Sequence, residues 1–124
     1  MSVQLKQLKT ELATELENIL SYWSKNAIDS QNDGFVGQID HSENRIENAE
    51  KGAVLNARIL WSFSSGYQVT KKEAHKKIAQ RAFEYVSNHL YDTEFGGLFW
   101  SIHADKTPKD TKNQIYALAF AIYG

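Results

Sequence analysis

The sequence predicts an all-α fold, and three observations support this class. Apolar residues recur every three or four positions near the N-terminus and again over residues 71–90, which is the spacing of amphipathic helices. Two other stretches, 51–64 and 111–123, are apolar on nearly all sides, which is typical of buried helices. Strand-like alternation is confined to short pieces of the connections between these segments.

The first predicted helix covers residues 3–24, with an apolar stripe on one face and Lys and Glu on the other. The polar stretch that follows, residues 25–50, is longer than an ordinary connection between helices. We therefore expect it either to have a function or to form short secondary-structure elements. Residues 35–39 are compatible with a short strand. The apolar stripe of the helix consists of Leu5, Leu8, Leu12, Leu16, Ile19 and Trp23.

The second predicted helix, residues 51–64, opens with Lys51 and has almost no polar face, so we expect it to be buried. Thr70 and Glu73 are then spaced as a capping box, in which each side chain accepts a hydrogen bond from a free backbone N–H. This box predicts the start of a third, amphipathic helix over residues 71–90.

The second long connection, residues 91–110, contains Gly96-Gly97 followed by an alternating stretch that predicts a short hairpin. A fourth helix over 111–123 is still strongly apolar where the sequence stops at Gly124. We therefore expect residues 1–124 to be the N-terminal part of a single longer domain, truncated at its C-terminus.

The order of amphipathic helix, long connection and buried helix occurs twice, and Lys51 and Lys112 open the two buried helices at matching places. Such a unit cannot cover both faces of its buried helix, and repeat arrays normally need about three or more units. Amphipathic helices outside and buried helices inside are the arrangement of an α/α toroid. We predict two helical hairpins of an (α/α)6 toroid, with short strand-like segments in the rim loops.

Composition and charge exclude several classes of function. The net charge of −1 gives nucleic-acid binding no electrostatic support. No apolar run reaches the roughly 18 residues of a membrane span, and the N-terminus lacks the apolar core of a signal peptide, so we expect a cytoplasmic protein without a membrane partner. The absence of cysteine excludes thiolate metal sites and a cysteine nucleophile. The aromatic content of 12% suits either core packing or a sugar-binding cleft.

Three segments carry a family resemblance. They are Lys51–Ser64 (KGAVLNARILWSFS), Tyr91–Trp100 (YDTEFGGLFW) and Lys112–Tyr123 (KNQIYALAFAIY), and nearly the whole chain takes part. In this order and spacing they resemble the cellobiose 2-epimerases of the N-acylglucosamine 2-epimerase superfamily, and the Asn-Ala-Arg-Ile-Leu-Trp form of the first segment favours the cellobiose branch. The resemblance implies an (α/α)6 barrel that converts the reducing-end glucose of cellobiose-like β-1,4 disaccharides to mannose.

The resemblance also implies a mechanism. Opening of the sugar ring exposes a C1 aldehyde that acidifies the C2 proton, one base removes this proton to give an enediolate, and a second group returns it to the other face. The family's catalytic histidines lie on later helices, so no catalytic residue is expected in this fragment, which alone should be inactive. No cofactor or metal is required, and the intact enzyme is expected to work as a monomer.

The substrate-binding residues implied are Arg58, Tyr116 and Trp100. Arg58 matches the family arginine that would hold and polarise the sugar oxygens at C1 and C2. Tyr116 matches a tyrosine that contacts the same sugar, and Trp100 is a candidate for stacking on a sugar ring. The structural alternatives are a salt bridge from Arg58 to Glu47 or Glu50, and core packing for the two aromatic residues.

Other polar residues and other functions remain as alternatives. Asn56 points to a different face from Arg58 and is expected to cap or bridge helices. An N-acylglucosamine 2-epimerase or an aldose–ketose isomerase could use the same barrel, and a glycoside hydrolase would need paired carboxylates, of which none stands out on the buried helices. A non-enzymatic helical interaction module is the last alternative. Surface positions are expected for the histidines, His41, His75, His89 and His103.

Overall fold

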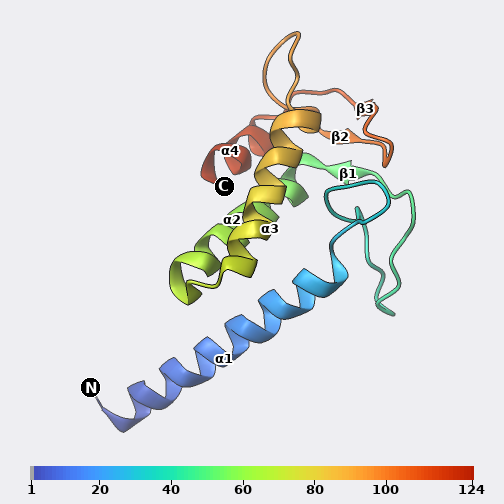
Figure 1. Ribbon diagram of the computed structural model, residues 1–124. Coiled ribbons are helices and arrows are strands. Elements are labelled where there is room, and N and C mark those ends of the chain that lie inside the picture. The colour runs from blue at the N-terminus through green and yellow to red at the C-terminus, as the bar shows by residue number, and fades with distance from the viewer. Residues whose placement is uncertain (1) are drawn as a thin grey trace.

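The computed structural model describes residues 2–124, in which helices are joined by long loops and a small sheet (Figure 1). Helix α1, Val3–Asn26, is capped by Ser2, whose Oγ accepts a hydrogen bond from the Leu5 N–H at 3.2 Å. The helix predicted over residues 3–24 is confirmed. Its N-terminal half extends away from the other helices, and Leu20 near its C-terminal end is the buried residue that joins it to the core.

Helix α2, Ala53–Thr70, lies where the second helix was predicted but begins two residues later and ends six residues later. It continues past residue 64 because Gly66 allows a close approach of α1, where a Cβ atom would lie 2.7 Å from a methyl carbon of Leu20. The expected burial on all sides is wrong for one face, because α1, α3 and α4 cover only the remaining sides. The exposed residues of that face are Leu55 and Arg58, and Trp61 at its edge is partly exposed although its ring stacks on a residue of α4.

Helix α3, Glu73–Tyr85, continues into a π-helical segment, Val86–Leu90, so the predicted end at residue 90 is confirmed. The predicted capping box is wrong, because α2 runs on through Thr70 and Lys72 is the residue that precedes α3. Thr70 still caps locally, since its Oγ1 accepts a hydrogen bond from the Lys72 N–H at 3.3 Å. Between the two helices Lys71 has a left-handed φ of 57°, which turns the chain back on itself.

Helix α4, Ile115–Tyr123, begins four residues later than predicted. The delay has a local cause, because the carboxylate of Asp110 accepts a hydrogen bond from the Lys112 N–H at 3.1 Å and holds that segment in a turn. The helix packs against α2, where the rings of Trp61 and Tyr123 stack with their centroids 5.6 Å apart.

A three-stranded antiparallel sheet connects the two long loops. Its order is β1-β2-β3, and the register pairs Lys51 with Ile102. The predicted hairpin after residue 97 is thus confirmed in part. The strand expected over residues 35–39 is wrong, because the region forms only isolated bridges, from Ile28 to Phe35 and from Ile39 to Arg45. The strands are β1 (Lys51–Gly52), β2 (Ser101–Ile102) and β3 (Pro108–Asp110).

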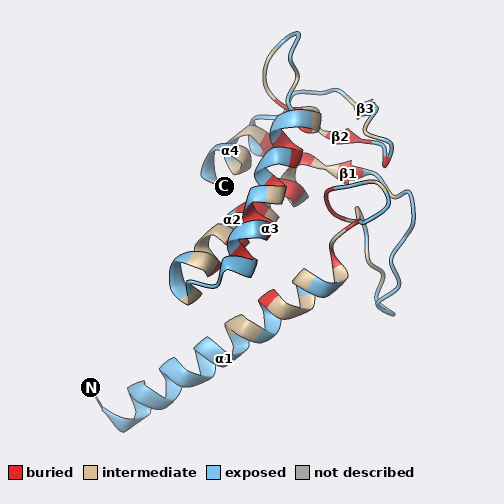
Figure 2. Cartoon of the chain, viewed as in Figure 1, coloured by how far each residue is buried: buried red, intermediate tan, exposed pale blue. Residues whose placement is uncertain are grey.

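The buried residues gather between α2, α3 and the two loops (Figure 2). One cluster is centred on Phe35, Leu60 and Phe63 and includes Leu20 of α1. A second cluster, which includes Leu90 and Ile102, lies where the sheet meets the ends of the helices. The core therefore fixes the loops to the start of α2. Among residues 2–124, no helix combines the length and apolar character that a membrane span requires.

Candidate functional site

The two long loops repeat one backbone turn, which begins at Asp29 in the first loop and at Asp92 in the second. The carboxylate of Asp29 accepts hydrogen bonds from the backbone N–H groups of Gln31 and Asn32, at 3.0 and 2.9 Å. The carboxylate of Asp92 accepts in the same way from the residues two and three positions later, Glu94 and Phe95, at 2.9 and 3.1 Å.

Each turn closes in the same way. The Asp29 N–H donates to the carbonyl of Gly34 at 3.1 Å, and the Asp92 N–H donates to the carbonyl of Gly97 at 3.0 Å. Both glycines have positive φ, 64° and 82°, a backbone conformation that residues with a side chain rarely adopt. The loops then lead to α2 and α4, so side chains at the N-terminal ends of these helices lie next to loop residues.

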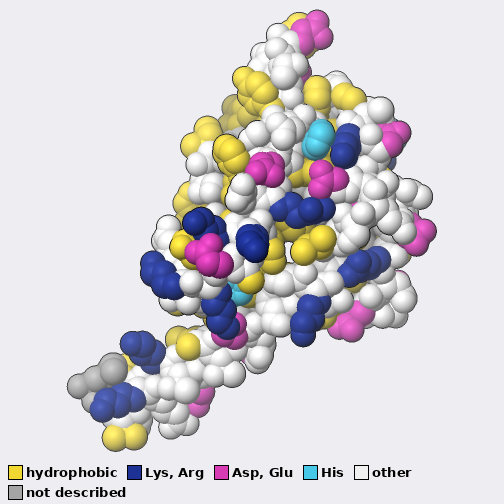
Figure 3. All heavy atoms as spheres, viewed as in Figure 1, with side chains coloured by type: hydrophobic (Ala, Val, Ile, Leu, Met, Phe, Trp, Pro, Cys, Tyr) yellow, Lys and Arg dark blue, Asp and Glu magenta, His cyan; other side chains and the backbone are white. Residues whose placement is uncertain are grey.

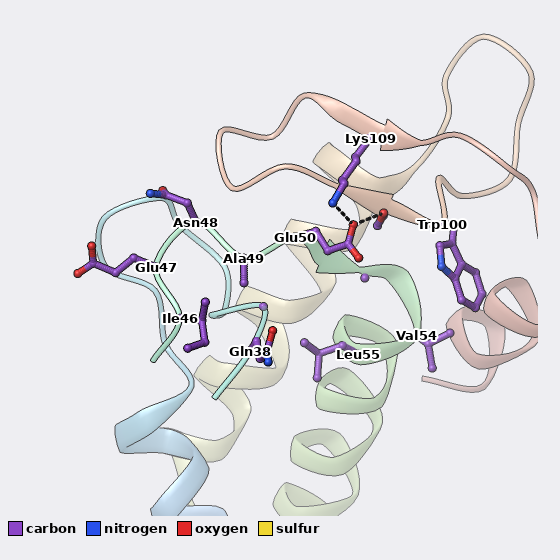
Figure 4. Close-up of a pocket in the computed structure, with 13 residues that line it drawn as sticks. Gln38, Ile46, Glu47, Asn48, Ala49, Glu50, Val54, Leu55, Trp100 and Lys109 are labelled. Atoms are coloured by element: carbon purple, nitrogen blue, oxygen red, sulfur yellow. Dashed lines mark hydrogen bonds and ion pairs between the residues drawn. The ribbon is translucent and has the colours of Figure 1, made fainter. Parts of the chain in front are cut away.

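A hollow of about 660 Å³, called here the loop hollow, lies between the two loops and the start of α2 (Figure 4). Its upper edge holds an ion pair, with Lys109 Nζ 2.7 Å from Glu50 Oε2, and the buried Ser101 hydroxyl donates to the same oxygen at 3.2 Å. Hydrogen bonding and charge from Lys109 lower the pKa of Glu50, so this carboxylate is ionised at neutral pH. The sides of the hollow include Gln38, Leu55 and Trp100.

A second hollow of about 630 Å³, called here the helix hollow, lies between α1 and α2 and is mainly apolar. Arg58 is the basic residue on its wall. Within residues 2–124 no carboxylate lies within 4 Å of the Arg58 guanidinium, so the expected alternative of a salt bridge to Glu47 or Glu50 is wrong. Glu50 is paired with Lys109 instead. The two hollows are neighbours because both are lined by Gly37, Gln38, Val54 and Leu55.

The structure does not bring the three predicted substrate-binding residues together in one cavity. Trp100 lines the loop hollow, and Lys112 Nζ lies over its ring, 5.0 Å from the centroid. Arg58 lines the helix hollow. Tyr116 is in the first turn of α4, 60% exposed, with its ring edge against Phe120, and it lines neither hollow.

A buried charge cluster beneath the first loop was not expected from the sequence. Lys51 is 1% exposed, and its Nζ lies 2.8 Å from Asp29 Oδ2, 2.6 Å from the carbonyl of Asp33 and 5.2 Å from the centre of the Tyr85 ring. Arg81 of α3 donates to the carbonyls of Gly34 and Asp29, both at 3.0 Å, and pairs with the Asp33 carboxylate at 2.8 Å. The cluster ties the first loop to β1 and α3.

The charge cluster also sets the ionisation of Asp29. Burial raises the pKa of its carboxyl group, but hydrogen bonds from the Asn32 backbone and from Lys51 lower it more, and the pKa is about 2. The signal that sequence reasoning missed is the single Lys at the start of an otherwise apolar segment. A lysine in that setting needs a buried partner.

The remaining polar candidates are structural. Asn56 is buried, and its side-chain amide donates to the Gly52 carbonyl one turn earlier at 2.8 Å, while its Oδ1 has no hydrogen-bond partner within residues 2–124. The expected role in capping or bridging helices is therefore wrong, because this bond goes to a carbonyl of the same helix and leaves the free N–H groups at its start without a side-chain partner. The expected surface position is wrong for His75, which is buried against Phe63 with its Nδ1 2.8 Å from Thr70 Oγ1. Its burial follows from the close packing of α3 on α2.

Metal binding and charge patches receive no support from the described residues. Over residues 2–124, no three His, Asp or Glu side chains gather closely enough to hold a metal ion. On the face shown in Figure 3, Lys and Arg are interspersed with Asp and Glu, without one dominant sign of charge.

Fold and site together define a class of protein, namely a helical protein that presents two joined hollows where its long loops meet the N-terminal ends of its helices. The family described as N-acylglucosamine 2-epimerase (GlcNAc 2-epimerase) matches residues 34–124. The chain belongs to this sugar epimerase family.

Individual relatives give a narrower comparison. The chain is 48% identical over 118 residues to a cellobiose 2-epimerase of Bacteroides fragilis, covering 94% of this chain and 30% of that protein. It is 39% identical to the cellobiose 2-epimerase of Eubacterium cellulosolvens over 86% of this chain and 26% of that protein. The structure of the cellobiose 2-epimerase of Spirochaeta thermophila superimposes with a TM-score of 0.89 at 36% identity, covering 97% of this chain and 30% of that chain. The chain thus spans less than a third of the length of these relatives.

Proposed function

We propose that this chain contributes the substrate-binding arginine to a sugar 2-epimerase that acts on cellobiose-like β-1,4 disaccharides. The observation that carries the proposal is Arg58, an exposed guanidinium with no carboxylate within 4 Å in residues 2–124, on the wall of the helix hollow between α1 and α2. An arginine in this position can donate to two neighbouring sugar oxygens at once. The resemblance to cellobiose 2-epimerases supports a disaccharide as the substrate.

Arg58 fits the charge that develops in the reaction. Removal of the C2 proton from the open-chain sugar moves an electron pair onto the aldehyde oxygen at C1, and a fixed cation next to this oxygen and the C2 hydroxyl stabilises the enediolate. Deprotonation and reprotonation on opposite faces then interconvert glucose and mannose without a net change in atoms. Two groups that titrate near neutral pH are needed, and imidazoles suit both roles.

We further propose that the chain forms two helical hairpins of an (α/α)6 barrel and that it is inactive alone. Neither hollow is lined by a histidine of residues 2–124, which supports imidazole groups supplied by other helices of the barrel. Apolar side chains on α1 and α4 are exposed and would be covered by further hairpins of a closed barrel. The most exposed of them include Leu12, Ile115 and Ile122.

A chimera tests this function. This chain would replace the matching 118-residue segment of the Bacteroides fragilis cellobiose 2-epimerase. We expect the chimera to convert cellobiose to its mannose-ended epimer and the isolated chain to leave cellobiose unchanged. Arg58→Ala should lower kcat/KM of the chimera by at least about 100-fold. The control Lys77→Ala, an exposed cation on α3, should leave the rate unchanged.

The products decide between the alternatives. A chimera that is folded by circular dichroism but does not change cellobiose would overturn the proposal, as would an Arg58→Ala variant as active as the parent. Conversion of N-acetylglucosamine instead of cellobiose would assign an N-acylglucosamine 2-epimerase. Conversion of mannose to a ketose would assign an aldose–ketose isomerase.

A further inference from the structure

We propose that the bond between Asp33 and Gly34 in the first loop is a site of chemical self-modification, at which the chain forms a succinimide and then isoaspartate, and that ion pairs to Asp33 slow this reaction in the folded protein. Asp33 is the one aspartate of the sequence that is followed by glycine, and no asparagine is. A glycine has no Cβ to hinder the approach of its nitrogen to the preceding side chain. The site lies outside both hollows, so the inference is independent of the proposed function.

The reaction needs only the chain and water. The Gly34 nitrogen loses its proton and attacks Cγ of the protonated Asp33 carboxyl group. The new N–Cγ bond closes a five-membered ring, and the carboxyl hydroxyl group leaves as water with that proton. A water molecule then opens the ring at either carbonyl. Opening at Cγ restores aspartate, whereas opening at the main-chain carbonyl gives isoaspartate, in which the backbone runs through Cβ and Cγ.

The folded loop brings the reacting groups together. The Gly34 N–H donates to Asp33 Oδ1 at 2.7 Å, so the nitrogen lies beside the carboxyl group that it attacks. Lys51 Nζ lies 2.6 Å from the Asp33 carbonyl oxygen, which belongs to the same amide as the Gly34 nitrogen. An ammonium group in this position stabilises the negative charge that the amide gains when its nitrogen loses a proton. The Asp33 side chain is 48% exposed, so water has access to the ring.

Two cations oppose the reaction because they keep Asp33 ionised. Arg81 lies 2.8 Å from Oδ1, and Lys106 lies 3.7 Å from Oδ2. Partial burial raises the pKa of the Asp33 carboxyl group, but the hydrogen bond from Gly34 and the charges of Arg81 and Lys106 lower it more. An ionised carboxylate resists attack by a nucleophile and has no hydroxyl group to lose. The rate of ring closure therefore follows the small protonated fraction.

The second loop shows that the turn itself does not require an aspartate here. Gly96 occupies the place of Asp33 in the second copy, and the two residues have similar φ, 77° and 68°. In the first loop the aspartate adds ion pairs to α3 and to the second loop, through Arg81 and Lys106. These attachments are made by a residue that is chemically less stable than the glycine of the second copy.

Isoaspartate would disrupt the first loop. Its additional backbone carbon displaces the Gly34 carbonyl, which accepts from the Asp29 N–H at 3.1 Å and from Arg81 Nε at 3.0 Å. The first bond closes the turn, and the second ties it to α3. The cations at Asp33 thus preserve the loop in two ways, because they attach it and also protect the bond that the modification would alter.

Peptide mass spectrometry tests the site. The folded chimera is incubated at neutral pH and digested, and the isoaspartyl peptide is separated and identified by its backbone fragments. Arg81→Gln should raise the rate of isoaspartate formation by about threefold or more, and Lys106→Gln by about twofold, because both increase the protonated fraction of the Asp33 carboxyl group. The control Lys77→Gln removes an exposed cation of α3 that is not a partner of Asp33 and should leave the rate unchanged.

Two comparisons separate ionisation from a loosened loop. Lys106→Gln keeps the bonds from Arg81 to the carbonyls of Gly34 and Asp29, so a faster rate in this variant cannot come from loss of those bonds. In guanidinium chloride the cations no longer pair with Asp33, and the parent and all variants should react at one common rate. Equal rates for the folded parent, Arg81→Gln and Lys106→Gln would overturn the protective role.

Asp33→Asn tests whether the folded geometry permits ring closure. An amide side chain does not ionise, and it closes the same ring with loss of ammonia, so the neighbouring cations no longer prevent the reaction. We expect this variant to deamidate at least as fast when folded as in guanidinium chloride, because Lys51 contacts the residue 33 carbonyl only in the folded state. Deamidation that folding suppresses would overturn the site. No readout uses epimerase activity, so failure of this inference leaves the proposed function untouched.

Discussion

The first and second long loops have the same backbone turn but are held in place by different means. Asp29 and Asp92 make equivalent bonds to the two following backbone N–H groups. Only Asp29 also meets a buried lysine, because Lys51 Nζ lies 2.8 Å from its carboxylate. The matching lysine of the second repeat, Lys112, is half exposed and lies over the Trp100 ring instead.

The difference indicates that two copies of one turn have different roles. In the first loop the charges face inward and attach the turn to β1 and α3. In the second loop the equivalent lysine stays at the surface beside an aromatic ring that lines a hollow. A local hydrogen-bond pattern is therefore enough to form the turn, and the longer-range partners decide whether it serves as scaffold or as ligand surface.

The largest expected effect breaks the buried pair. Lys51→Met should lower the free energy of unfolding by about 3 kcal/mol, because it leaves the Asp29 carboxylate buried without its cation. Lys112→Met is the matched variant in the second repeat, and its loss should stay below about 1 kcal/mol because its partners are exposed. Urea unfolding followed by circular dichroism measures both. Equal losses would show that the two loops are anchored alike.

A smaller effect is expected from the glycines that close the two turns. An added Cβ at Gly34 would collide with the Tyr85 ring, whereas at Gly97 it would meet the Asn113 side chain, which can move aside. Both positions also carry the strain of positive φ. Gly34→Ala should lower the free energy of unfolding by about 3 kcal/mol, and Gly97→Ala should lower it by about 1 kcal/mol. Thermal unfolding of the two variants side by side gives the difference, and a larger loss for Gly97→Ala would contradict the packing argument.

The smallest effect concerns acid stability. Because the folded pKa of Asp29, about 2, is below its ordinary value of 3.8, ionised Asp29 stabilises the fold fully above pH 3.8, and this contribution is lost as pH falls through 2. Asp29→Asn should therefore be less stable than the parent at neutral pH and show a shallower fall in Tm between pH 4 and pH 2. The control Asp92→Asn keeps Asp29 and should keep the steep fall. A parallel pH profile for Asp29→Asn and the parent would rule out this linkage.

The sequence was sufficient to place the helices, because apolar periodicity is a local property. The predicted ends of the helices were less accurate. The capping box at Thr70 was wrong because packing of Gly66 against Leu20 favours continuing α2 through the position where a free helix would have stopped. The start of α4 was wrong because a side-chain bond from Asp110 holds a turn that apolar content cannot indicate.

The site was predictable only in part. Arg58 and Trp100 were found through their segments and do line hollows. The pairs Asp29–Lys51 and Glu50–Lys109 join residues that are far apart along the chain, and no local pattern specifies such partners. The repeat was visible in the order of the helices. The two loops match as well, with Asp29 at the position of Asp92, and the lysines that follow them differ in burial.

The pairing of β1 with β2 has a consequence for the order of events during synthesis. Lys51 pairs with Ile102, so the strand that precedes α2 waits for a segment that is made only after all of α2 and α3. Until residues 101–102 leave the ribosome, Lys51 can pair with Asp29, but β2 is not yet present to pair with β1. The first repeat is therefore expected to mature only together with the second, and a pause in translation shortly after residue 52 would expose a charged, half-folded loop to proteases and chaperones.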